Sequence, residues 1–287
     1  MESGLGVLVA VGAGGVGDGT LDLVAAEALR RGTGVQVLHV VHSMVVLPPQ
    51  TGQTTSIDLT LQRVGRDVLA DAAARLRPRL EERVPLRTEL LAGPVATTIA
   101  DCSRGRDLVV LERREPDRLG HLLTMSVSTR VAAHAHVPVV VVPRGWSPAD
   151  RELPVTVGVD QPVDPVGQAE VAAAYAAETG RPLTVLHALW LAEAYQDAAF
   201  VHHTRRQWTA EADSALWRGL RKLDGTGAEI THHVSWARPV DALVAASRRS
   251  TILVMSRRPG RHGAHLGPVT RTELRHAECP VMVVDRA

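Results

Sequence analysis

The stretch "HAHVPVVVV", residues 134–142, decides the fold because the chain contains it twice. It returns as "HAECPVMVV" at residues 276–284, which is 142 positions later. Two more pairs repeat in the same order: "VLHVVH" (37–42) with "VLHALW" (185–190), and "GPVATTIA" (93–100) with "RPVDALVA" (238–245). The offset falls along the chain from 148 to 145 to 142. This pattern is typical of two copies of one domain that differ by small insertions and deletions.

The joint between the copies lies near "PRGWSPADRELP", residues 143–154, which is rich in proline and polar residues. Such composition marks a linker. A chain of 287 residues is long enough for two ordinary domains. We therefore expect one domain at residues 1–145 and a second at residues 152–287.

Each copy reads as five strands that alternate with helices. The expected strands are 7–11, 35–41, 86–91, 107–111 and 137–142 in the first copy, and 155–159, 183–189, 229–234, 251–255 and 281–284 in the second. Most are continuous runs of Val, Leu and Ile, as in parallel strands that are covered on both faces. The sequence therefore predicts an α/β fold of two tandem doubly wound domains. Each would hold a five-stranded parallel sheet flanked by helices, with right-handed crossovers.

The first helix of each copy carries recognisable end signals. In "GDGTLDLVAAEALRRG", residues 17–32, we expect Asp18 or Thr20 as the N-cap and Gly32 just past the end. In the second copy, Asp164 precedes Pro165 at the expected first turn, and Gly180 lies at the exit.

Composition narrows the class of protein. Hydrophobic residues make up 45% of the chain, and the formal net charge of +1 argues, although weakly, against a dedicated nucleic-acid binder. No apolar run reaches the ~18 residues that span a membrane, and the N-terminus has no basic lead-in of a secretory leader. Cys102 and Cys279 cannot build a disulfide framework, which fits a reducing cytoplasm.

The repeated stretches resemble the universal stress protein family in tandem form. The resemblance rests in the first copy on "GVQVLHVVH", "GPVATTIADCSRGRDLVVL" and "SVSTRVAAHAHVPVVVVPRG", and in the second on "VTVGVDQP", "RPLTVLHALW" and "HAECPVMVV". It implies an adenine nucleotide alpha hydrolase-like fold in each half. It also implies that the two domains pair about a two-fold axis through their last strands. Because "VPVVVV" and "CPVMVV" are apolar edges that need cover, we expect them to pair within the chain.

The resemblance also implies where ATP would bind. ATP-binding members carry an Asp at the end of the first strand, and they contact the base through backbone near the end of the second strand. Their phosphate loop runs glycine, two residues, glycine, nine residues, glycine, then Ser or Thr. Glycines there let backbone N–H groups curl around the phosphates.

The first copy departs from this pattern at every glycine. In "DLVVLERREPDRLGHLLTMSVSTR", residues 107–130, the glycine positions fall on Glu112, Glu115 and Met125, although Ser126 is kept. The strand-one Asp falls on Gly12. Two carboxylates would repel a triphosphate, so we expect no ATP in this copy. Two interpretations of the charged loop stay open. It is either simply solvated, or it forms a self-paired polar plug of Glu112, Arg113, Arg114 and Glu115.

The second copy keeps part of the pattern. Asp160 is present, and in "SRRPGRHGAHLGPVT" (256–270) the glycine positions fall on Ser256, Pro259 and Gly267. The second spacer is two residues short, and Pro268 replaces the Ser or Thr. Both prolines remove N–H donors. The sequence therefore predicts a loop that has kept its place in the fold but has lost its phosphate-binding chemistry.

Any residual nucleotide site would thus lie in the second copy. Its candidate cofactor-binding residues are Asp160, His187, Ala188, Leu189, Ser256, Arg257, Arg258 and Gly267, and its candidate cofactor is ATP. For Asp160 we weigh contact with base or ribose against a turn cap. For the basic residues Arg257, Arg258, Arg261 and His262 we weigh an anion site at the carboxyl edge of the sheet against a solvated loop.

Three other motifs give weaker evidence of a functional site. "GAGGVG", residues 12–17, matches the dinucleotide pattern, but the second strand ends in "HVVHSM" without an acidic residue for a ribose. His232 and His233 are neighbours on a strand and face opposite sides, and no His/Cys spacing resembles a zinc site. We find no nucleophile–base constellation, so we expect no catalytic residues and no metal.

The sequence therefore predicts a non-catalytic, stress-linked regulatory or binding protein of the cytoplasm, with degenerate nucleotide sites. The alternatives are a nucleotide- or anion-binding module that uses the second copy, or a slow ATP hydrolase. Protein partners and a homodimer stay open, whereas nucleic acid and membranes are not expected.

Overall fold

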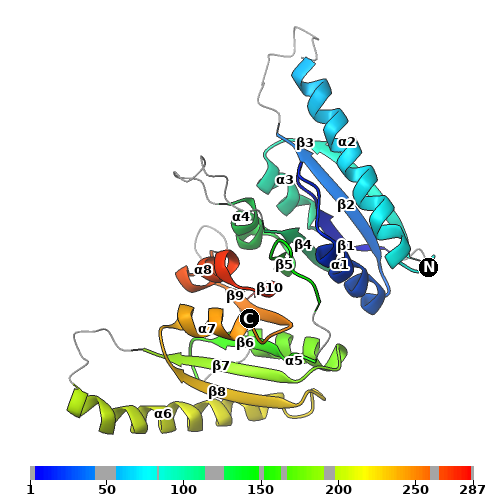
Figure 1. Cartoon of the computed structure of the whole chain (residues 1–287). Helices are drawn as coiled ribbons and strands as arrows, with labels where there is room; N and C mark the ends of the chain where they lie inside the picture. The colour runs from blue at the N-terminus through cyan, green and yellow to red at the C-terminus, as the bar shows by residue number, and fades with distance from the viewer. Residues whose placement is uncertain are drawn as a thin grey trace. The chain divides into compact units, whose positions relative to one another are not determined.

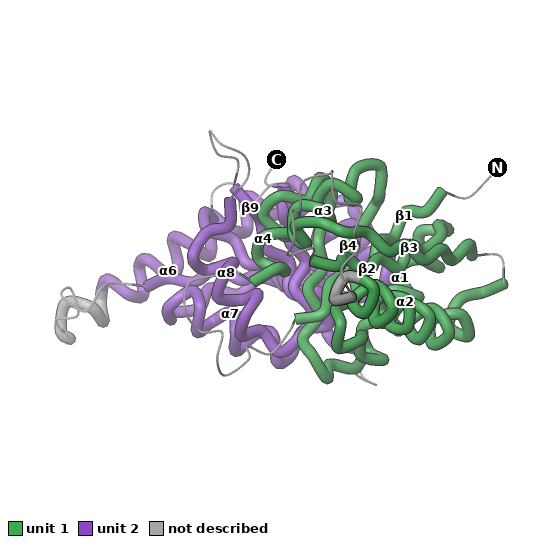
Figure 2. The backbone as a smooth tube through the Cα atoms, turned by 90° about the horizontal axis from the view of Figure 1, so that it is seen from above, with its two compact units in different colours: residues 1–148 green, residues 149–287 purple. Residues whose placement is uncertain are grey.

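The computed structural model describes residues 4–42, 56–82, 84–113, 126–148, 152–162, 167–190, 198–258 and 265–285. The chain divides into two compact units, Met1–Pro148 and Ala149–Ala287, which Figure 2 colours separately. None of the helices in the described ranges is both long enough and apolar enough to cross a membrane.

Unit 1 is a parallel sheet with helices on its two faces (Figure 1). In chain order its elements are β1 (Leu5–Ala10), α1 (Asp18–Arg31), β2 (Gly34–Val41), α2 (Ser56–Leu76), the short 3₁₀ helix η1 (Arg77–Arg79), β3 (Leu86–Ala92), α3 (Val95–Cys102), β4 (Leu108–Glu112), α4 (Val127–His134) and β5 (Val139–Val142). The strands lie in the order β3-β2-β1-β4-β5, and each pair of neighbours is parallel.

Unit 2 repeats this arrangement. Its elements are β6 (Val155–Val159), α5 (Gln168–Glu178), β7 (Leu183–Leu189), α6 (Ala198–Leu220), η3 (Arg221–Leu223), β8 (Ile230–Trp236), α7 (Pro239–Ser247), β9 (Ile252–Arg257), α8 (Pro268–His276) and β10 (Val281–Asp285). Its strands lie in the order β8-β7-β6-β9-β10, again all parallel. The prediction of two doubly wound α/β domains is confirmed. The expected pairing of the two last strands stays a prediction.

Burial explains which strands lie in the middle of each sheet. Strand β2 is buried at every residue, and β6 likewise, because helices cover both faces of these valine-rich runs. The outer strands β3 and β8 are more polar, and none of their residues is buried. Helices α1 and α2 pack together against the sheet of unit 1, whereas α3 packs with α4, and in unit 2 α7 packs with α8.

Of the two expected helix starts, the first is wrong and the second lies outside the described residues. The N-cap of α1 is Gly17, which offers no side-chain hydrogen bond; Asp18 is the first helical residue and Thr20 is buried. Gly19 leaves room for the chain after β5, since a Cβ there would lie 1.8 Å from the carbonyl oxygen of Trp146. In unit 2, α5 begins at Gln168, and the expected start at Asp164 and Pro165 lies outside the described residues.

The expected helix ends are confirmed. Gly32 follows α1 with a φ of 62°, in the left-handed region that closes a helix and favours glycine. Its amide donates to the carbonyl oxygens of Ala28 and Leu29. Gly180, with a φ of 65°, lies one residue past the C-cap of α5.

A buried histidine joins the first two strands of each unit. The Nδ1 atom of His39 lies 2.8 Å from the carbonyl oxygen of Val11, and that of His187 lies 3.0 Å from the carbonyl oxygen of Val159. Both carbonyl groups lie where the first strand ends and its ladder stops. A buried carbonyl group without a partner is costly, so the repeated histidine satisfies it where the backbone cannot.

At one buried position the two repeats differ in polarity. Glu273 on α8 is 0% exposed, and neither of its carboxyl oxygens has a hydrogen-bond partner among the described residues. Its counterpart in the first repeat is Val131, also 0% exposed. Burial raises the pKa of Glu273 to about 8. Unit 2 thus keeps a carboxyl group at an apolar position, and it is uncharged at neutral pH.

We predict that Glu273→Val stabilises the protein, and more so at pH 8 than at pH 5. The folded state holds the Glu273 proton up to about pH 8, whereas the unfolded chain releases it near pH 4.3. Stability of the natural protein therefore falls as pH rises through this window, by up to ~1.4 kcal/mol per pH unit. Thermal melts from pH 5 to 9 measure the difference. Glu278→Gln is the control, because Glu278 is exposed and pairs with Arg248; equal pH profiles for wild type and Glu273→Val would contradict the prediction.

Candidate functional site

The candidate site of each unit lies where the first and fourth strands end side by side. In unit 1, β1 pairs with β4 up to Ala10 and Leu111; in unit 2, β6 pairs with β9. The connections from these two strands run to opposite sides of the sheet, and ligands of open α/β sheets bind at such a point. The residues that follow these four strands therefore decide what each unit can bind.

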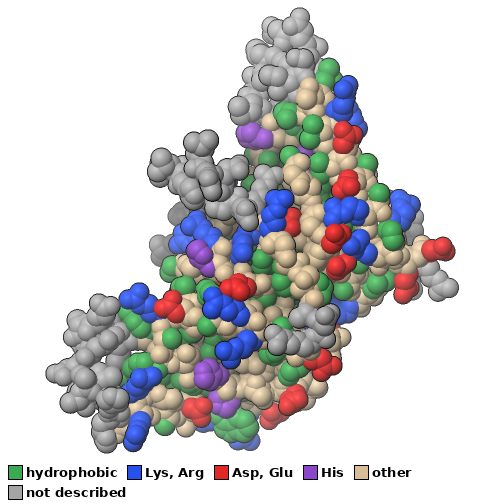
Figure 3. Space-filling view, viewed as in Figure 1, with side chains coloured by type: hydrophobic (Ala, Val, Ile, Leu, Met, Phe, Trp, Pro, Cys, Tyr) green, Lys and Arg blue, Asp and Glu red, His purple; other side chains and the backbone are tan. Residues whose placement is uncertain are grey.

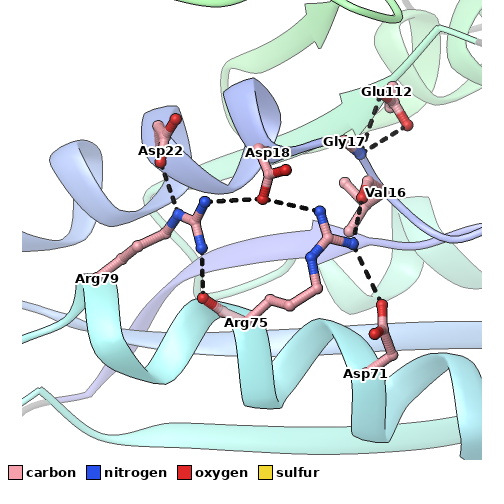
Figure 4. Close-up of polar contacts among 8 residues, drawn as sticks. All are labelled: Val16, Gly17, Asp18, Asp22, Asp71, Arg75, Arg79 and Glu112. Carbon is pink, nitrogen blue, oxygen red and sulfur yellow. Dashed lines mark hydrogen bonds and ion pairs between the residues drawn. The ribbon is translucent and has the colours of Figure 1, made fainter.

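In unit 1, a carboxylate of the chain itself occupies this point. Glu112 ends β4, and both of its carboxylate oxygens lie 3.2 Å from the backbone nitrogen of Gly17, which donates to them (Figure 4). Gly17 is the N-cap of α1, and the first N–H groups of a helix give it a partial positive charge. The Glu112 carboxylate thus takes a position that suits an anionic ligand.

The contact between Glu112 and Gly17 bears on the choice of glycine at residue 17 and on the pKa of Glu112. A Cβ at Gly17 would lie 2.7 Å from the Glu112 Oε1 atom, so only glycine lets the carboxylate come this close. Burial raises the pKa of Glu112 above its usual range, while the Gly17 hydrogen bond and the charges of Arg144 and Arg75 oppose that shift. Unit 1 therefore holds a half-buried carboxyl group whose negative charge is disfavoured by burial and only partly offset by the Gly17 hydrogen bond and the two arginines.

A network of arginines and aspartates fixes the same turn from the other side (Figure 4). Arg75 on α2 donates to the carbonyl oxygen of Val16 at 2.8 Å and pairs with Asp18 at 2.9 Å. Arg79 also reaches Asp18, at 2.8 Å. The hydrogen bond and charge of Arg75 hold the pKa of Asp18 below its usual range. The network ties α2 to the first turn of α1 and places the Gly17 amide opposite Glu112.

The other residues that we singled out in the first copy have structural roles or lie outside the described part. Gly12 forms a tight turn after β1, in which the Gly15 amide donates to its carbonyl oxygen at 2.9 Å. Ser126 caps α4 by accepting a hydrogen bond from the Thr129 amide at 3.2 Å. Arg114, Glu115 and Met125 lie outside the described residues. Of the expected polar plug, the structure shows the contact of Glu112 with the Gly17 amide and a backbone hydrogen bond of 2.7 Å from the Arg113 amide to the carbonyl oxygen of Val142.

In unit 2, the two charged candidates Asp160 and Arg258 form an ion pair with each other. Asp160 follows β6 and Arg258 follows the neighbouring strand β9. Their side chains are 55% and 52% exposed. The backbone of Arg258 also exchanges two hydrogen bonds of 2.9 Å with that of His265, which joins the two ends of the segment between them. Arg258 thus both neutralises Asp160 and fixes the base of the loop.

Arg257 lies apart from this pair. Its side chain is 2% exposed, and Nε and Nη2 contact the two carboxylate oxygens of Asp285 at 2.6 and 2.9 Å. This two-point geometry is the strong form of an arginine–carboxylate contact. The ladder between β9 and β10 continues through the same two residues, so both strands run further than we expected. The structure thus buries Arg257, which differs from the solvated loop or anion site considered for it.

The remaining candidates are held by the backbone. His187 is buried and its ring contacts Val159, as described above. Ala188 and Leu189 end β7 and pair with β8. The carbonyl oxygen of Ser256 accepts a hydrogen bond from Thr270 Oγ1 at 3.2 Å. Gly267 is the N-cap of α8 with an ordinary extended backbone, and Pro268 follows it as the first helical residue.

Sequence reasoning missed an aromatic pair at the same edge of unit 2. Trp190 directly follows β7 and is 47% exposed. The guanidinium carbon of Arg238, the N-cap of α7, lies 5.5 Å from the centre of its indole ring. Both residues stand within the repeated stretches "VLHALW" and "RPVDALVA", but a single sequence does not show that they meet. Among the described residues, no three His, Cys, Asp or Glu side chains gather as metal ligands do.

Comparison with known proteins agrees with the repeat. The sequence profile of the universal stress protein family matches residues 6–143 and again residues 154–285. A universal stress protein of Mycobacterium tuberculosis is 30% identical over 208 residues, which cover 68% of this chain but 64% of that relative, less than two thirds of its length. One from Mycolicibacterium smegmatis is 26% identical over 291 residues and matches at 97% and 96% of the two lengths.

A solved structure agrees at the level of the fold. The crystal structure of a universal stress protein from Archaeoglobus fulgidus covers 98% of both chains with a TM-score of 0.63 and 17% identity. Together with the two profile matches and the repeated strand order, these similarities leave one conclusion: the chain belongs to the universal stress protein family and carries its domain twice in tandem.

Proposed function

We propose that this chain is a non-catalytic stress-response regulator of the cytoplasm in which the ATP-binding loops of both halves are degenerate. The observation that carries the proposal is the contact of the Glu112 carboxylate with the Gly17 amide. It places a carboxyl group of the chain at the strand end where a nucleotide phosphate would have to approach.

Electrostatics supports the proposal for unit 1. A triphosphate would meet Glu112 and Asp18 at this edge, and neither charge can leave without breaking contacts of the chain itself. The end of β1 offers the turn at Gly12 and no carboxylate for a base. An incoming nucleotide would therefore gain little and lose the internal hydrogen bonds of the turn.

In unit 2, the residues that follow β6 and β9 support the proposal of a degenerate site. Asp160, the one acid that could accept a hydrogen bond from a base or ribose, is already paired with Arg258. Pro268 has no N–H group at the first position of α8, so that helix offers one donor fewer to a phosphate. On the face of the molecule shown in Figure 3, basic and acidic side chains are interspersed, which agrees with a protein that is not specialised for nucleic acid.

We predict that magnesium ATP gives no heat of binding and no shift in melting temperature at low salt, because neither loop sequence keeps the glycine pattern of a phosphate loop. Isothermal titration calorimetry and thermal melts of the full chain measure both. Saturable binding at two sites per chain would refute the proposal. Binding at one site would place a nucleotide in unit 2 and favour the second candidate below.

We predict that Glu112→Ala lowers the melting temperature but does not create ATP binding in unit 1. The variant leaves the Gly17 amide without its partner, which costs about 1–3 kcal/mol when the group stays out of water. The missing acid after β1 and the missing glycines remain. Glu112→Gln is the matched control, since its amide oxygen still accepts from Gly17. Tight ATP binding by Glu112→Ala would show that this carboxylate alone had closed the site.

A second candidate function is a nucleotide- or anion-binding module in unit 2. The observation that favours it is the exposure of the Asp160–Arg258 pair, of which each side chain is more than half exposed. Exposed ion pairs contribute only about 0–1 kcal/mol to stability. An incoming ligand can therefore separate Asp160 from Arg258 at little cost, and both groups then become available to it.

If this module operates, Asp160→Ala should weaken binding of an adenine nucleotide about tenfold, because the charged acceptor for base or ribose is lost. Asp224→Ala is the control, since Asp224 is exposed and lies before β8, at the opposite edge of the sheet. ATP turnover by the wild type and by Asp160→Ala tests for catalysis. ATP turnover by the wild type that Asp160→Ala abolishes would contradict the non-catalytic proposal and favour a slow hydrolase.

A further inference from the structure

Trp190 is unusual in this protein because it exposes a large aromatic surface at the candidate site. The whole chain holds only five tryptophans. Trp190 follows the last residue of β7, and 47% of it is exposed to solvent. Leaving so much apolar surface in water forgoes the burial that stabilises most aromatic residues. Trp217 is even more exposed, at 59%, so what distinguishes Trp190 is that its exposed ring lies at the candidate site.

Another tryptophan of unit 2 shows what a packing role looks like. The rings of Trp208 and Trp236 stack with their centres 6.1 Å apart and their planes 10° from parallel, and Arg205 covers Trp236 at 5.1 Å. In that cluster, indole meets indole and both rings are partly buried between α6 and β8. Trp190 has the arginine contact, from Arg238, but keeps nearly half of its surface open.

Trp190 and Arg238 also lie in a row with the two charged residues of the candidate site. Arg258 follows β9, Asp160 follows β6, Trp190 follows β7 and Arg238 lies two residues after β8. These four strands are neighbours in that order. Because neighbouring strands lie ~4.8 Å apart, the row spans roughly 15 Å. A cation, an anion, an aromatic face and a second cation thus follow one another along the carboxyl edge.

The first unit lacks the aromatic pair. By the aligned repeats, His42 takes the place of Trp190, and Gly93 takes the place of Arg238. Gly93 has a φ of 152° and follows β3 in a bend that carries no side chain. The fold of the repeat is therefore complete without an indole and a guanidinium at these positions. The pair is a property of unit 2 and not a requirement of the sheet.

We propose that Trp190 is a stacking platform for the planar ring of a nucleoside monophosphate at the carboxyl edge of unit 2, and that Arg238 covers this ring until the ligand takes its place. The inference rests on the second candidate function, because it assigns the ligand's ring to the same edge. Any nucleobase can stack on an indole, because every base has a flat π-face. The displaced guanidinium then pairs with the phosphate, for which arginine is suited.

A monophosphate fits this row better than a triphosphate does. The row offers only two arginine side chains, and in the loop after β9 two of the three glycine positions of the family pattern hold other residues. Ring stacking, by contrast, needs no phosphate loop. The ligand would thus be held mainly through its ring, with a single anionic group at Arg238.

The test is a titration of the full chain with AMP, adenosine and, as a ligand without the ring, ribose 5-phosphate. We expect AMP and adenosine to bind, and ribose 5-phosphate to bind at least tenfold more weakly than AMP. Trp190→Ala should weaken AMP roughly 5- to 150-fold, the range of one lost base stack. Trp190→Phe keeps a ring and should lose less than threefold. Arg238→Ala should weaken AMP but leave adenosine unchanged or tighter.

Fluorescence shows where the ligand lies. Subtracting the signal of Trp190→Phe from that of the wild type isolates Trp190, which AMP should quench. Trp217→Phe is the matched control, because Trp217 is also exposed but contacts His232 near the start of β8. This control should bind AMP as the wild type does.

Two results would overturn the inference, and they differ in what they mean for the site. If AMP binds and Asp160→Ala weakens it while Trp190→Ala does not, the module exists but Trp190 is not its platform. If neither AMP nor adenosine binds the wild type at millimolar concentration, the module and the platform both fail, and the non-catalytic regulator with degenerate loops stands alone.

Discussion

The structure depends on one constraint: the central strands of both sheets are buried on both faces. Runs such as Val35–Val41 and Val155–Val159 can be covered in this way only if a helix crosses over after each strand. All strands then point the same way, and the polar groups that follow them collect at one edge. The fold therefore fixes where chemistry can occur before any functional residue is considered. What the edge can do depends on the few residues that end each strand.

At that edge, several charged side chains contact other groups of the same chain. Glu112 contacts the Gly17 amide, Asp160 pairs with Arg258, and Arg257 pairs with Asp285. A desolvated charge without a partner is expensive, which accounts for the internal contacts of the half-buried Glu112 and the buried Arg257. An anionic ligand that approached the end of β4 would have to displace the Glu112 carboxylate from the Gly17 amide first.

The sequence predicted the framework well and the contacts poorly. Continuous apolar runs and the repeated "HA…PVVVV" motif determine strands, order and domain number, since these follow from periodicity and repetition. The predicted N-cap of α1 was wrong. Asp18 and Thr20 have side chains that can cap a helix, but both lie inside α1. The N-cap is Gly17, and its amide donates to Glu112. Glu112 and Gly17 are 95 residues apart, and no single-sequence pattern links them. The buried Glu273 was visible in principle, since aligning the repeats sets it against Val131.

The two units place different groups at this edge, and this difference carries the functional argument. In unit 1 the group is a half-buried carboxylate bound to a helix N-terminus, and Arg75 and Arg79 hold that turn through Asp18. Losing the Glu112 contact would leave the Gly17 amide without its partner, which costs more than separating an exposed ion pair. In unit 2 the group is a solvent-exposed ion pair, which contributes little to stability. An open indole lies at the same edge, two strands away from Arg258. If either half of this chain still exchanges a ligand with solvent, the energetics therefore favour unit 2, while unit 1 contributes a closed domain of the same fold.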